Sequence, residues 1–518
     1  MVAALVMERR MSNELDNLLD SMMSDIPASA PKKKELTPQQ LAFIEAYSKT
    51  RKNLMLEAVA GSGKTFTLVQ AAHALMTPTL ALAFNKRIAD ELAKKMPAHV
   101  TCKTMNSLGH AAFGAKIGKK LRLESNKIGD IIKTFPKDLK DYYWDHPEIK
   151  ALINGARVNC LVPQGAHGLE ASPSGEWEAL VDSLDYDLSS DEKRVALQFA
   201  TKVLVASIYQ AWNGIIDFDD QLYMSVVTRS PFPRFNTVLI DEAQDLSPVQ
   251  HEMLALIGGR VVAAGDPYQA IYGFRGALFD SMDRLAGRFS MTQMPLSVSF
   301  RCPAGVVKEA QAFVNHIESA PDAPAGNVIT LKEESIENIL EGDMVVCRKN
   351  GPLISLFFKL LREGKPSVIL GREIGQSLKK LVLKYKDLKI EELQPALDQW
   401  LQMEIANNED KATKQQLAYD KHHAILTVLK NRKPATVSAL AVMFEEMFRD
   451  ERSKTVLCSI HKAKGLEEKR VHFYGFDECP MIWKGQTEDE QRQELNLCYV
   501  AVTRSMDTLF FHPIAKDE

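Results

Sequence analysis

Long hydrophobic runs are absent from this sequence of 518 residues. Its apolar stretches, such as VLVASIY from Val203, fall far short of the roughly 20 residues that a membrane-spanning helix requires. The apolar start, MVAALVM, is followed rather than preceded by charged residues, which is the reverse of a secretory signal. We therefore expect no membrane partner, and a location in the cytoplasm, or in the host cytoplasm if a phage encodes the protein.

The sequence also lacks paired cysteine motifs and an excess of basic charge. Its seven cysteines are scattered, with no CxxC pair and no clustered histidines to complete a zinc site, so we interpret them as reduced thiols. The formal net charge of −3 argues against bulk coating of nucleic acid but says nothing about a local groove. A nucleic-acid partner must therefore be argued from particular sites.

The sequence does contain an alternation of short apolar runs and helical patterns. The strand candidates lie at residues 79–84, 100–104, 237–242 and 260–266, and a second set lies at 343–348, 366–371, 454–460, 470–476 and 507–513. Such alternation predicts parallel sheets covered by helices. Two helix-rich stretches interrupt it. The predicted fold is therefore α/β, with two parallel-sheet domains that each carry a mainly helical insertion.

The domain limits follow from these changes of pattern. A mixture of Met, Ser, Asp, Pro and Lys at the start predicts a flexible segment. We expect the flexible segment at 1–35, the first α/β domain at 36–112 and 216–290, its insertion at 113–215, the second α/β domain at 291–375 and 451–518, and its insertion at 376–450.

Residues 54–75 predict a strand, a glycine-rich loop and a helix in succession. The loop, GSGKT, consists of Gly61, Ser62, Gly63, Lys64 and Thr65. Backbone N–H groups of such a loop can surround phosphate oxygens at a helix N-terminus, where the helix dipole also favours an anion. Lys64 would reach the β and γ phosphates, and Thr65 would bind Mg²⁺. Ala58 stands where the full phosphate-loop pattern has its first glycine.

The segment VLIDEAQD, residues 238–245, predicts an apolar strand that ends in two carboxylates. Asp241, at the end of the strand, can hold Mg²⁺, and Glu242 can accept a proton from an attacking water molecule. Together with the glycine loop upstream, this strand end predicts a site that hydrolyses a nucleoside triphosphate.

Six segments occur in the order, and at roughly the spacing, of the superfamily 1 helicases of the UvrD/Rep type. They are AGSGKT, DEAQD, GDPYQAIYGFRGA, SFRCP, SIHKAKGLE and LCYVAVTRS. The segments AFNKRIADEL and CKTMNSLGH are closest to the F-box DNA helicase branch, although we find no F-box segment. The resemblance covers about residues 36–315 and 340–513, the motor part only, and it implies two RecA-like domains with an insertion in each.

The resemblance implies a role in ATP binding and hydrolysis for residues of both domains, with ATP and Mg²⁺ as cofactors. Gln40 is similar to the glutamine that reads the adenine base, and Phe300 to the aromatic residue that stacks on it. Arg301 and Arg504 resemble the two arginines that the second domain presents to the γ-phosphate, and Glu467 resembles a residue that helps to bind the nucleotide. Gln269 resembles the glutamine that senses the γ-phosphate.

The resemblance also implies a single-stranded DNA track. Tyr272 and Phe274 would stack on bases, which is tolerant of sequence because every base has a face. The other residues that fall where the family contacts the strand are Phe84, Asn85, Lys86, Thr104 and His461. Phe274 replaces a more common tryptophan, and Asn106 stands in place of a frequent histidine. Basic runs at 115–122 and 379–389 are equally compatible with DNA-facing surfaces and solvated helix faces.

These observations predict an ATP-dependent DNA helicase that translocates on single-stranded DNA, with the 3′ to 5′ polarity that the family implies, and unwinds duplex DNA. Its partners would be single-stranded DNA, junctions with duplex DNA, and replication, repair or recombination proteins. Two alternatives stay open: an RNA-directed motor of the same superfamily, and a nucleic-acid-stimulated ATPase that remodels protein–DNA complexes without unwinding. A phosphate-loop kinase or GTPase would have no use for aromatic residues beside Gln269.

Overall fold

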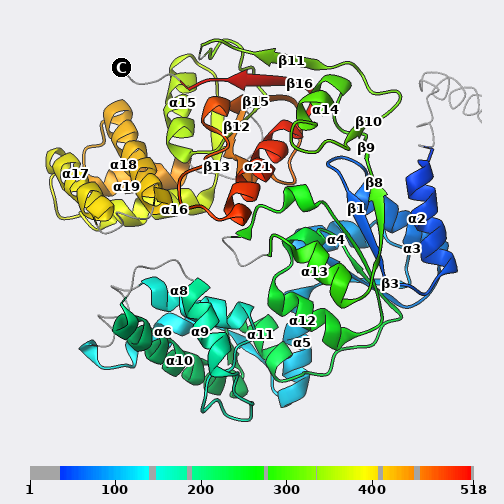
Figure 1. Ribbon diagram of the computed structural model, residues 1–518. Coiled ribbons are helices and arrows are strands. Elements are labelled where there is room, and N and C mark those ends of the chain that lie inside the picture. Colours follow the sequence, from blue (N-terminus) through cyan, green and yellow to red (C-terminus); the bar gives the residue numbers. More distant parts are fainter. Residues whose placement is uncertain are drawn as a thin grey trace, which may run out of the picture. The chain divides into compact units, whose positions relative to one another are not determined.

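The computed structural model describes residues 35–83, 85–138, 147–183, 189–273, 278–333, 335–406, 412–447 and 455–514 (Figure 1). Phe84, Phe274 and residues 1–34 of the expected N-terminal segment lie outside the described residues. The chain divides into two units, residues 1–42 and 43–518, and each is described by itself.

The described part of the first unit contains the start of helix α2 (Pro38–Lys49). The backbone N–H of Thr37 donates to Gln40 Oε1 at 3.0 Å, and the backbone N–H of Gln40 donates to Thr37 Oγ1 at 3.1 Å. This reciprocal pair satisfies two donors near the helix start, where intrahelical partners are missing. The side chain of Gln40 thus caps its own helix.

Within the described residues, the second unit contains two six-stranded sheets whose neighbouring strands are all parallel. The first sheet has the order β3 (Val100–Thr104), β2 (Thr79–Ala83), β6 (Thr237–Ile240), β7 (Arg260–Gly265), β1 (Leu54–Ala58) and β8 (Thr292–Leu296). Strands β2, β6 and β7 are buried along their whole length, as expected for a parallel sheet covered on both faces.

The second sheet confirms the other half of the predicted fold. Its order is β11 (Asn327–Thr330), β16 (Ser505–His512), β15 (Glu468–Tyr474), β12 (Met344–Cys347), β14 (Thr455–Ser459) and β13 (Ser367–Leu370). All nine strand candidates from the sequence are present in the two sheets. Two edge strands were missed: β8 contains Pro295, which only an edge strand tolerates readily, and β11 is largely exposed.

Helices accompany the first sheet and build its insertion. Those packed around the sheet are α3 (Lys64–Ala74), α4 (Lys86–Ala93), α5 (Met105–Ile117), α12 (Pro248–Ile257) and α13 (Ser281–Arg288). The insertion contains α6 (Lys127–Lys133), α8 (Pro147–Val158), α9 (Ser174–Ser183) and α10 (Ser190–Trp212), which form one group in Figure 1. Helix α11 (Asp220–Val227) follows the insertion and packs mainly against α5 and α12 of the sheet domain. A short parallel pair, β4 (Arg122–Leu123) and β5 (Ile215–Ile216), joins the start and end of the insertion.

The second sheet has the same arrangement of covering and inserted helices. Helices α14 (Ala304–Ala310), α15 (Asn350–Arg362), α20 (Ile460–Ala463) and α21 (Glu488–Val502) belong to the sheet domain. Helices α16 (Arg372–Leu383), α17 (Ile390–Ala406), α18 (Ala412–Arg432) and α19 (Val437–Met447) form the second inserted group (Figure 1). The two-domain α/β class with helical insertions is therefore confirmed, while the limits between domains stay a prediction. None of the described helices has the length and apolar character needed to cross a membrane.

A buried cluster of histidines joins two neighbouring strands of the second sheet. His472 Nδ1 lies 2.8 Å from His512 Nε2, and His472 Nε2 lies 2.7 Å from Asp343 Oδ2. Both histidines are fully buried. Burial lowers the pKa of His512 to about 3, with His472 adding to the effect, and burial also lowers the pKa of His472 although Asp343 opposes it.

This cluster predicts acid sensitivity of folding. Both histidines have pKa values below the usual 6.5, so the unfolded chain takes up protons first, and their stability contribution is complete above pH 6.5 and falls as pH falls toward the folded pKa. Each such group can cost up to about 1.4 kcal/mol per pH unit in that window. His512→Gln should therefore flatten the fall of the thermal midpoint between pH 6.5 and 4.5, and the exposed control His73→Gln should not. Equal slopes in the wild type and His512→Gln would contradict the account.

Candidate functional site

The glycine-rich loop lies between β1 and α3, where the sequence predicts it. Gly61 and Gly63 have φ angles of +74° and +82°, in the left-handed region that glycine adopts without strain. A Cβ atom on Gly61 would lie 2.5 Å from Cβ of Arg301, so a side chain there would displace the neighbouring segment. The loop therefore brings bare backbone to the N-terminus of α3, the arrangement that suits an anion.

The acidic end of β6 faces this loop. Thr65 Oγ1 donates to Asp241 Oδ2 at 2.5 Å, and Lys64 Nζ lies 3.1 Å from both carboxylate oxygens of Glu242. Glu242 has a φ angle of +59°, which is uncommon for a residue with a side chain and costs about 1–3 kcal/mol. The structure thus brings four predicted residues together from two distant segments and holds one of them in a strained conformation.

The charged side chains at this point lie close enough to shift one another's pKa values. Burial acts to lower the pKa of Lys64, but Glu242, Asp241 and Asp266 outweigh it and raise that pKa. Desolvation opposes the charge of Glu242, yet Lys64 and then Lys464 hold its pKa at about 2. Burial, followed by the charge of Glu242, raises the pKa of Asp241.

The donor set fits Mg²⁺. Asp241 and Thr65 offer hard oxygen atoms, the kind of ligand that Mg²⁺ takes in proteins. Burial and the charge of Glu242 disfavour the charged form of Asp241 and so raise its pKa, and a divalent cation bound there would favour the charged form.

A chain of hydrogen bonds leads from the acidic strand end to Gln269. Gln244 Nε2 donates to Glu242 Oε2 at 2.6 Å, and the backbone N–H of Asp266 donates to Gln244 Oε1 at 3.0 Å. Gln269 Nε2 then donates to Asp266 Oδ2 at 2.6 Å. Gln244 was missed in the sequence reasoning, although an amide within an acidic run was the available signal.

The predicted arginines lie close to this series of hydrogen bonds, and their side chains already have partners within the protein. Arg504 Nη2 donates to Gln269 Oε1 at 3.4 Å, and its other nitrogens donate to the carbonyl oxygens of Val500 and Leu466 at 2.9 and 3.1 Å. Burial, with Arg301 nearby, lowers the pKa of Arg504 to about 10.

Arg301 and its neighbours border the glycine loop. Arg301 Nε pairs with Glu467 Oε2 at 2.5 Å, which joins two predicted nucleotide residues to each other. The backbone N–H of Phe300 donates to the carbonyl of Gly61 at 2.9 Å, and the ring of Phe300 is exposed. The hydroxyl of Tyr499, which the sequence reasoning missed, accepts a hydrogen bond from the N–H of Ala60 at 2.9 Å.

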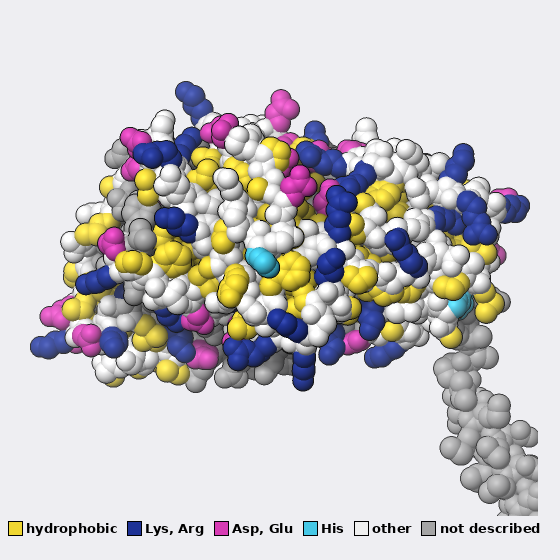
Figure 2. All heavy atoms as spheres, turned by 90° about the horizontal axis from the view of Figure 1, so that it is seen from below, with side chains coloured by type: hydrophobic (Ala, Val, Ile, Leu, Met, Phe, Trp, Pro, Cys, Tyr) yellow, Lys and Arg dark blue, Asp and Glu magenta, His cyan; other side chains and the backbone are white. Residues whose placement is uncertain are grey.

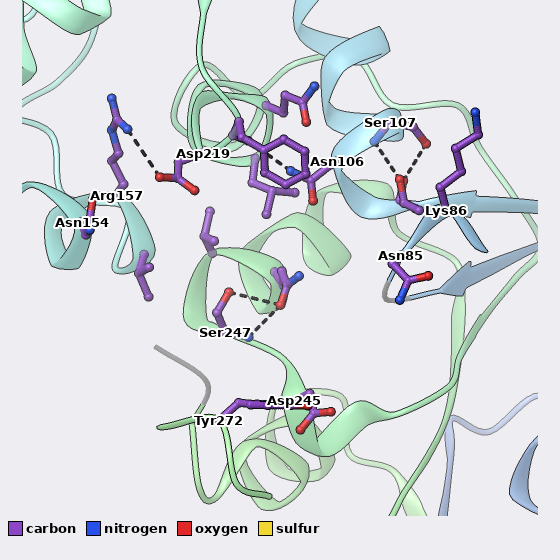
Figure 3. Close-up of a pocket in the computed structure, with 17 residues that line it drawn as sticks. Asn85, Lys86, Asn106, Ser107, Asn154, Arg157, Asp219, Asp245, Ser247 and Tyr272 are labelled. Carbon is purple, nitrogen blue, oxygen red and sulfur yellow. Dashed lines mark hydrogen bonds and ion pairs between the residues drawn. The ribbon is translucent and has the colours of Figure 1, made fainter. Parts of the chain in front are cut away.

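A cavity of about 680 Å³ gathers most of the predicted DNA contacts (Figure 3). Asn85, Lys86, Thr104 and Tyr272 all line it. Asn85 and Thr104 are N-caps of α4 and α5, because their side chains accept hydrogen bonds from the backbone of the first helical turn. His461 is not among the lining residues, but its carbonyl accepts a hydrogen bond from the hydroxyl of Tyr272 at 3.3 Å.

The first insertion and the segment directly after it supply the side of this cavity that the sequence reasoning missed. Phe218 lines the cavity with 62% of its surface exposed, and its carbonyl accepts from Asn106 Nδ2 at 3.1 Å. Arg157 lies across the cavity from Asn85 in Figure 3 and pairs with Asp217 at 2.9 Å. The available signal was an aromatic residue between acids in the segment IIDFDDQ.

The charged side chains on the side of the molecule that Figure 2 shows do not mark out a separate DNA-binding face. Figure 2 shows Lys and Arg side chains dispersed among acidic and hydrophobic ones on one face of the molecule, rather than gathered in one patch.

Two parallel sheets, a glycine loop at a helix N-terminus and a facing acidic strand end define the class of two-domain phosphate-loop proteins. Residues 36–290 match the sequence profile of the UvrD/REP helicase N-terminal domain, and residues 372–516 match that of the UvrD-like helicase C-terminal domain. Together the two matches span well over half of the chain, and the protein belongs to the UvrD-like helicase family.

Curated relatives are similar at low identity. The chain is 26% identical to F-box DNA helicase protein 1 of Schizosaccharomyces pombe over 310 residues, 56% of this chain and 34% of the relative. It is 24% identical to ATP-dependent DNA helicase PcrA of Leuconostoc citreum over 299 residues, 52% and 38% of the two chains. A probable DNA helicase of Mycoplasma pneumoniae is 23% identical over 479 residues, 87% and 78% of the two chains. The chain spans only 34% of the length of the F-box DNA helicase protein and 38% of the length of PcrA.

Proposed function

We propose that the protein is an ATP-dependent DNA helicase that moves along single-stranded DNA, with 3′ to 5′ polarity, and unwinds duplex DNA ahead of it. The observation that carries the proposal is that hydrogen bonds connect the acidic strand end beside the glycine loop with the segment that borders the cavity. The hydrogen-bonded chain that starts at Glu242 ends at Gln269, three residues before Tyr272, which lines the cavity. The relatives named as DNA helicases support the same activity.

In this proposal the glycine loop and Lys64 bind the phosphates of ATP. Thr65 and Asp241 hold Mg²⁺, which neutralises phosphate charge when it is bound. Glu242 receives the proton of the attacking water molecule. Its low pKa comes chiefly from Lys64, so when Lys64 turns to the phosphates, Glu242 regains basicity at the moment when a base is required.

The second domain completes the nucleotide site. Arg301 and Arg504 stabilise charge on the transferring phosphoryl group, and Gln269 reports the state of the γ-phosphate. By the family resemblance, Phe300 stacks on the adenine base and Glu467 helps to bind the nucleotide. The present hydrogen bond between Arg504 and Gln269 supports this grouping, because it already joins two residues assigned to the γ-phosphate.

The cavity would hold the DNA strand. Tyr272 and Phe218 stack on bases, Lys86 and Asn85 contact the phosphate backbone, and Thr104 supports them. Phe84, Phe274 and His461 extend the same track by the family resemblance. Junctions between single-stranded and duplex DNA are the proposed substrates, and replication, repair or recombination proteins are the proposed partners.

Phe218→Ala tests whether Phe218 contacts the DNA strand in the cavity. Loss of one stacking contact should weaken binding of single-stranded DNA by about 1–3 kcal/mol, whatever its sequence. Fluorescence anisotropy with labelled oligothymidylate and a mixed-sequence oligonucleotide measures this. The exposed Tyr209 lies outside the lining residues, so Tyr209→Ala is the control. Unchanged affinity of Phe218→Ala for both oligonucleotides would remove Phe218 from the track.

Strand displacement tests the function itself. We expect ATP-dependent unwinding of a duplex with a 3′ single-stranded tail and little unwinding of the same duplex with a 5′ tail. Hydrolysis stimulated by DNA without unwinding of either substrate would favour the protein-remodelling alternative. Stronger stimulation by RNA than by DNA would favour the RNA-directed motor, since the 2′-OH is the feature that distinguishes the two.

A further inference from the structure

The ammonium group of Lys464 lies where the nucleotide site and the DNA cavity meet. Lys464 Nζ is 2.7 Å from both carboxylate oxygens of Asp245 and donates to the carbonyl oxygen of Gln269 at 2.6 Å. The same nitrogen lies 4.8 Å from the centre of the Tyr272 ring, within the range of a cation–π interaction. One side chain therefore contacts the acidic segment, the sensor loop and the aromatic residue of the cavity.

These contacts join the two sheet domains. Lys464 follows β14 and α20 of the second sheet, whereas Asp245, Gln269 and Tyr272 follow β6 and β7 of the first. The side chains of Lys464 and Asp245 are only 8% and 5% exposed. A pair of charges removed from water to this extent is kept only if each charge is well satisfied. The compact ammonium group, with three donors on a flexible stem, can serve a carboxylate and a carbonyl together, which the planar fork of arginine does less well.

The partners of Lys464 connect it to both sites. Asp245 lines the cavity together with Tyr272 (Figure 3). Gln269 is bound through its side chain to Asp266 and Arg504 on the nucleotide side. A second contact joins Tyr272 to the segment that contains Lys464, because the hydroxyl of Tyr272 donates a hydrogen bond to the carbonyl of His461. A shift of the second domain would thus be transmitted to the Tyr272 ring and to the Gln269 loop at once.

We propose that Lys464 is a positioning residue that couples the two sites, holding the Tyr272 ring and the Gln269 loop in a fixed relation to Asp245. This inference rests on the proposed function, because it assigns DNA to the cavity and ATP to the glycine loop. Lys464 touches neither Lys64 nor Asp241, and its contacts are with Asp245 and the Gln269 loop, so we expect its loss to reduce the ratio of the hydrolysis rates with and without DNA.

The test is ATP hydrolysis by Lys464→Met with and without single-stranded DNA, compared with the wild type. The rate without DNA is measured as the reference, because the charge of Lys464 also lowers the pKa of Glu242 and its loss changes that rate too. The stimulation by saturating DNA should fall by about 5- to 150-fold, the range of a typical coupling between two sites. The exposed neighbour Lys469 provides the control, and Lys469→Met should keep full stimulation.

A second variant separates positioning from stability. Lys464→Met leaves the Asp245 carboxylate unpaired, whereas Asp245→Asn combined with Lys464→Met removes both charges. We expect the double variant to recover the thermal midpoint of the wild type but not the stimulation by DNA. Recovery of both would show that Lys464 only compensates a charge, and the proposal would be overturned.

The outcomes also separate this inference from the proposed function. A wild-type protein that hydrolyses ATP without any response to DNA would refute the DNA-dependent motor itself. A wild-type protein that responds to DNA, with an equal response in Lys464→Met, would refute only the positioning role of Lys464.

Discussion

Lys64→Ala is expected to reduce ATP hydrolysis by about 10³-fold, the loss seen when a preorganised group that stabilises transition-state charge is removed. Its ammonium group is the partner of Glu242 at 3.1 Å, and neighbouring acids raise its pKa, so it is a cation at neutral pH. Without it, the phosphates would meet Asp241 and Glu242 with no compensating side chain from the loop. Steady-state phosphate release at saturating ATP and DNA measures the effect.

The matched control is Lys52→Ala, on an exposed residue before β1. It should hydrolyse ATP like the wild type. Lys64→Ala should also lose the increase in ATPase rate that DNA causes, because DNA can stimulate only a protein that hydrolyses ATP. A Lys64→Ala protein with more than a tenth of the wild-type rate would mean that the glycine loop is not the phosphate site.

Arg504→Ala should lower kcat by about 10³- to 10⁵-fold, the range reported for an arginine that stabilises the transferring phosphoryl group. Its pKa of about 10 keeps it charged at neutral pH despite burial. Its hydrogen bond to Gln269 Oε1 places it beside the proposed γ-phosphate sensor. ATP binding should change far less than kcat, because the arginine acts mainly on charge that develops during transfer.

The comparison of Arg504→Ala with Arg504→Lys separates catalysis from structure. Arg504 also donates to the carbonyl oxygens of Val500 and Leu466, so Arg504→Ala should lower the thermal midpoint as well. Lysine keeps the charge but loses the planar fork, so Arg504→Lys should recover part of the midpoint and little of kcat. A kcat that recovers in step with the midpoint would show that Arg504 is structural.

The elements with a strong local pattern could be predicted from the sequence. The buried strands β2, β6, β7, β12 and β14 consist of short apolar runs, and their pattern survives in any context. The edge strand β8 could not be found in this way, because its residues are mostly exposed and it contains a proline. Its place depends on pairing with β1, which is a long-range contact.

The residues of the candidate site also differ in how well the sequence alone could predict them. Lys64, Thr65, Asp241 and Glu242 stand in short motifs whose chemistry is local, and the structure brings them together. Phe218 stands in no such motif, and Lys464 stands in the segment SIHKAKGLE without a role assigned to it from the sequence. Phe218 becomes part of the cavity only through the packing of the segment that follows the insertion, and the contacts of Lys464 depend on the approach of residues about 200 positions away.

We expect ATP hydrolysis at the site around Lys64 to be coupled to DNA binding in the cavity beside Tyr272. The most direct measurement is the ATPase rate of the wild-type protein and of Tyr272→Ala as single-stranded DNA is titrated. We predict a strong, saturable increase of kcat in the wild type, and in Tyr272→Ala a weaker increase with a higher half-saturating DNA concentration. Hydrolysis that is indifferent to DNA in the wild type, or an identical titration in Tyr272→Ala, would contradict the account.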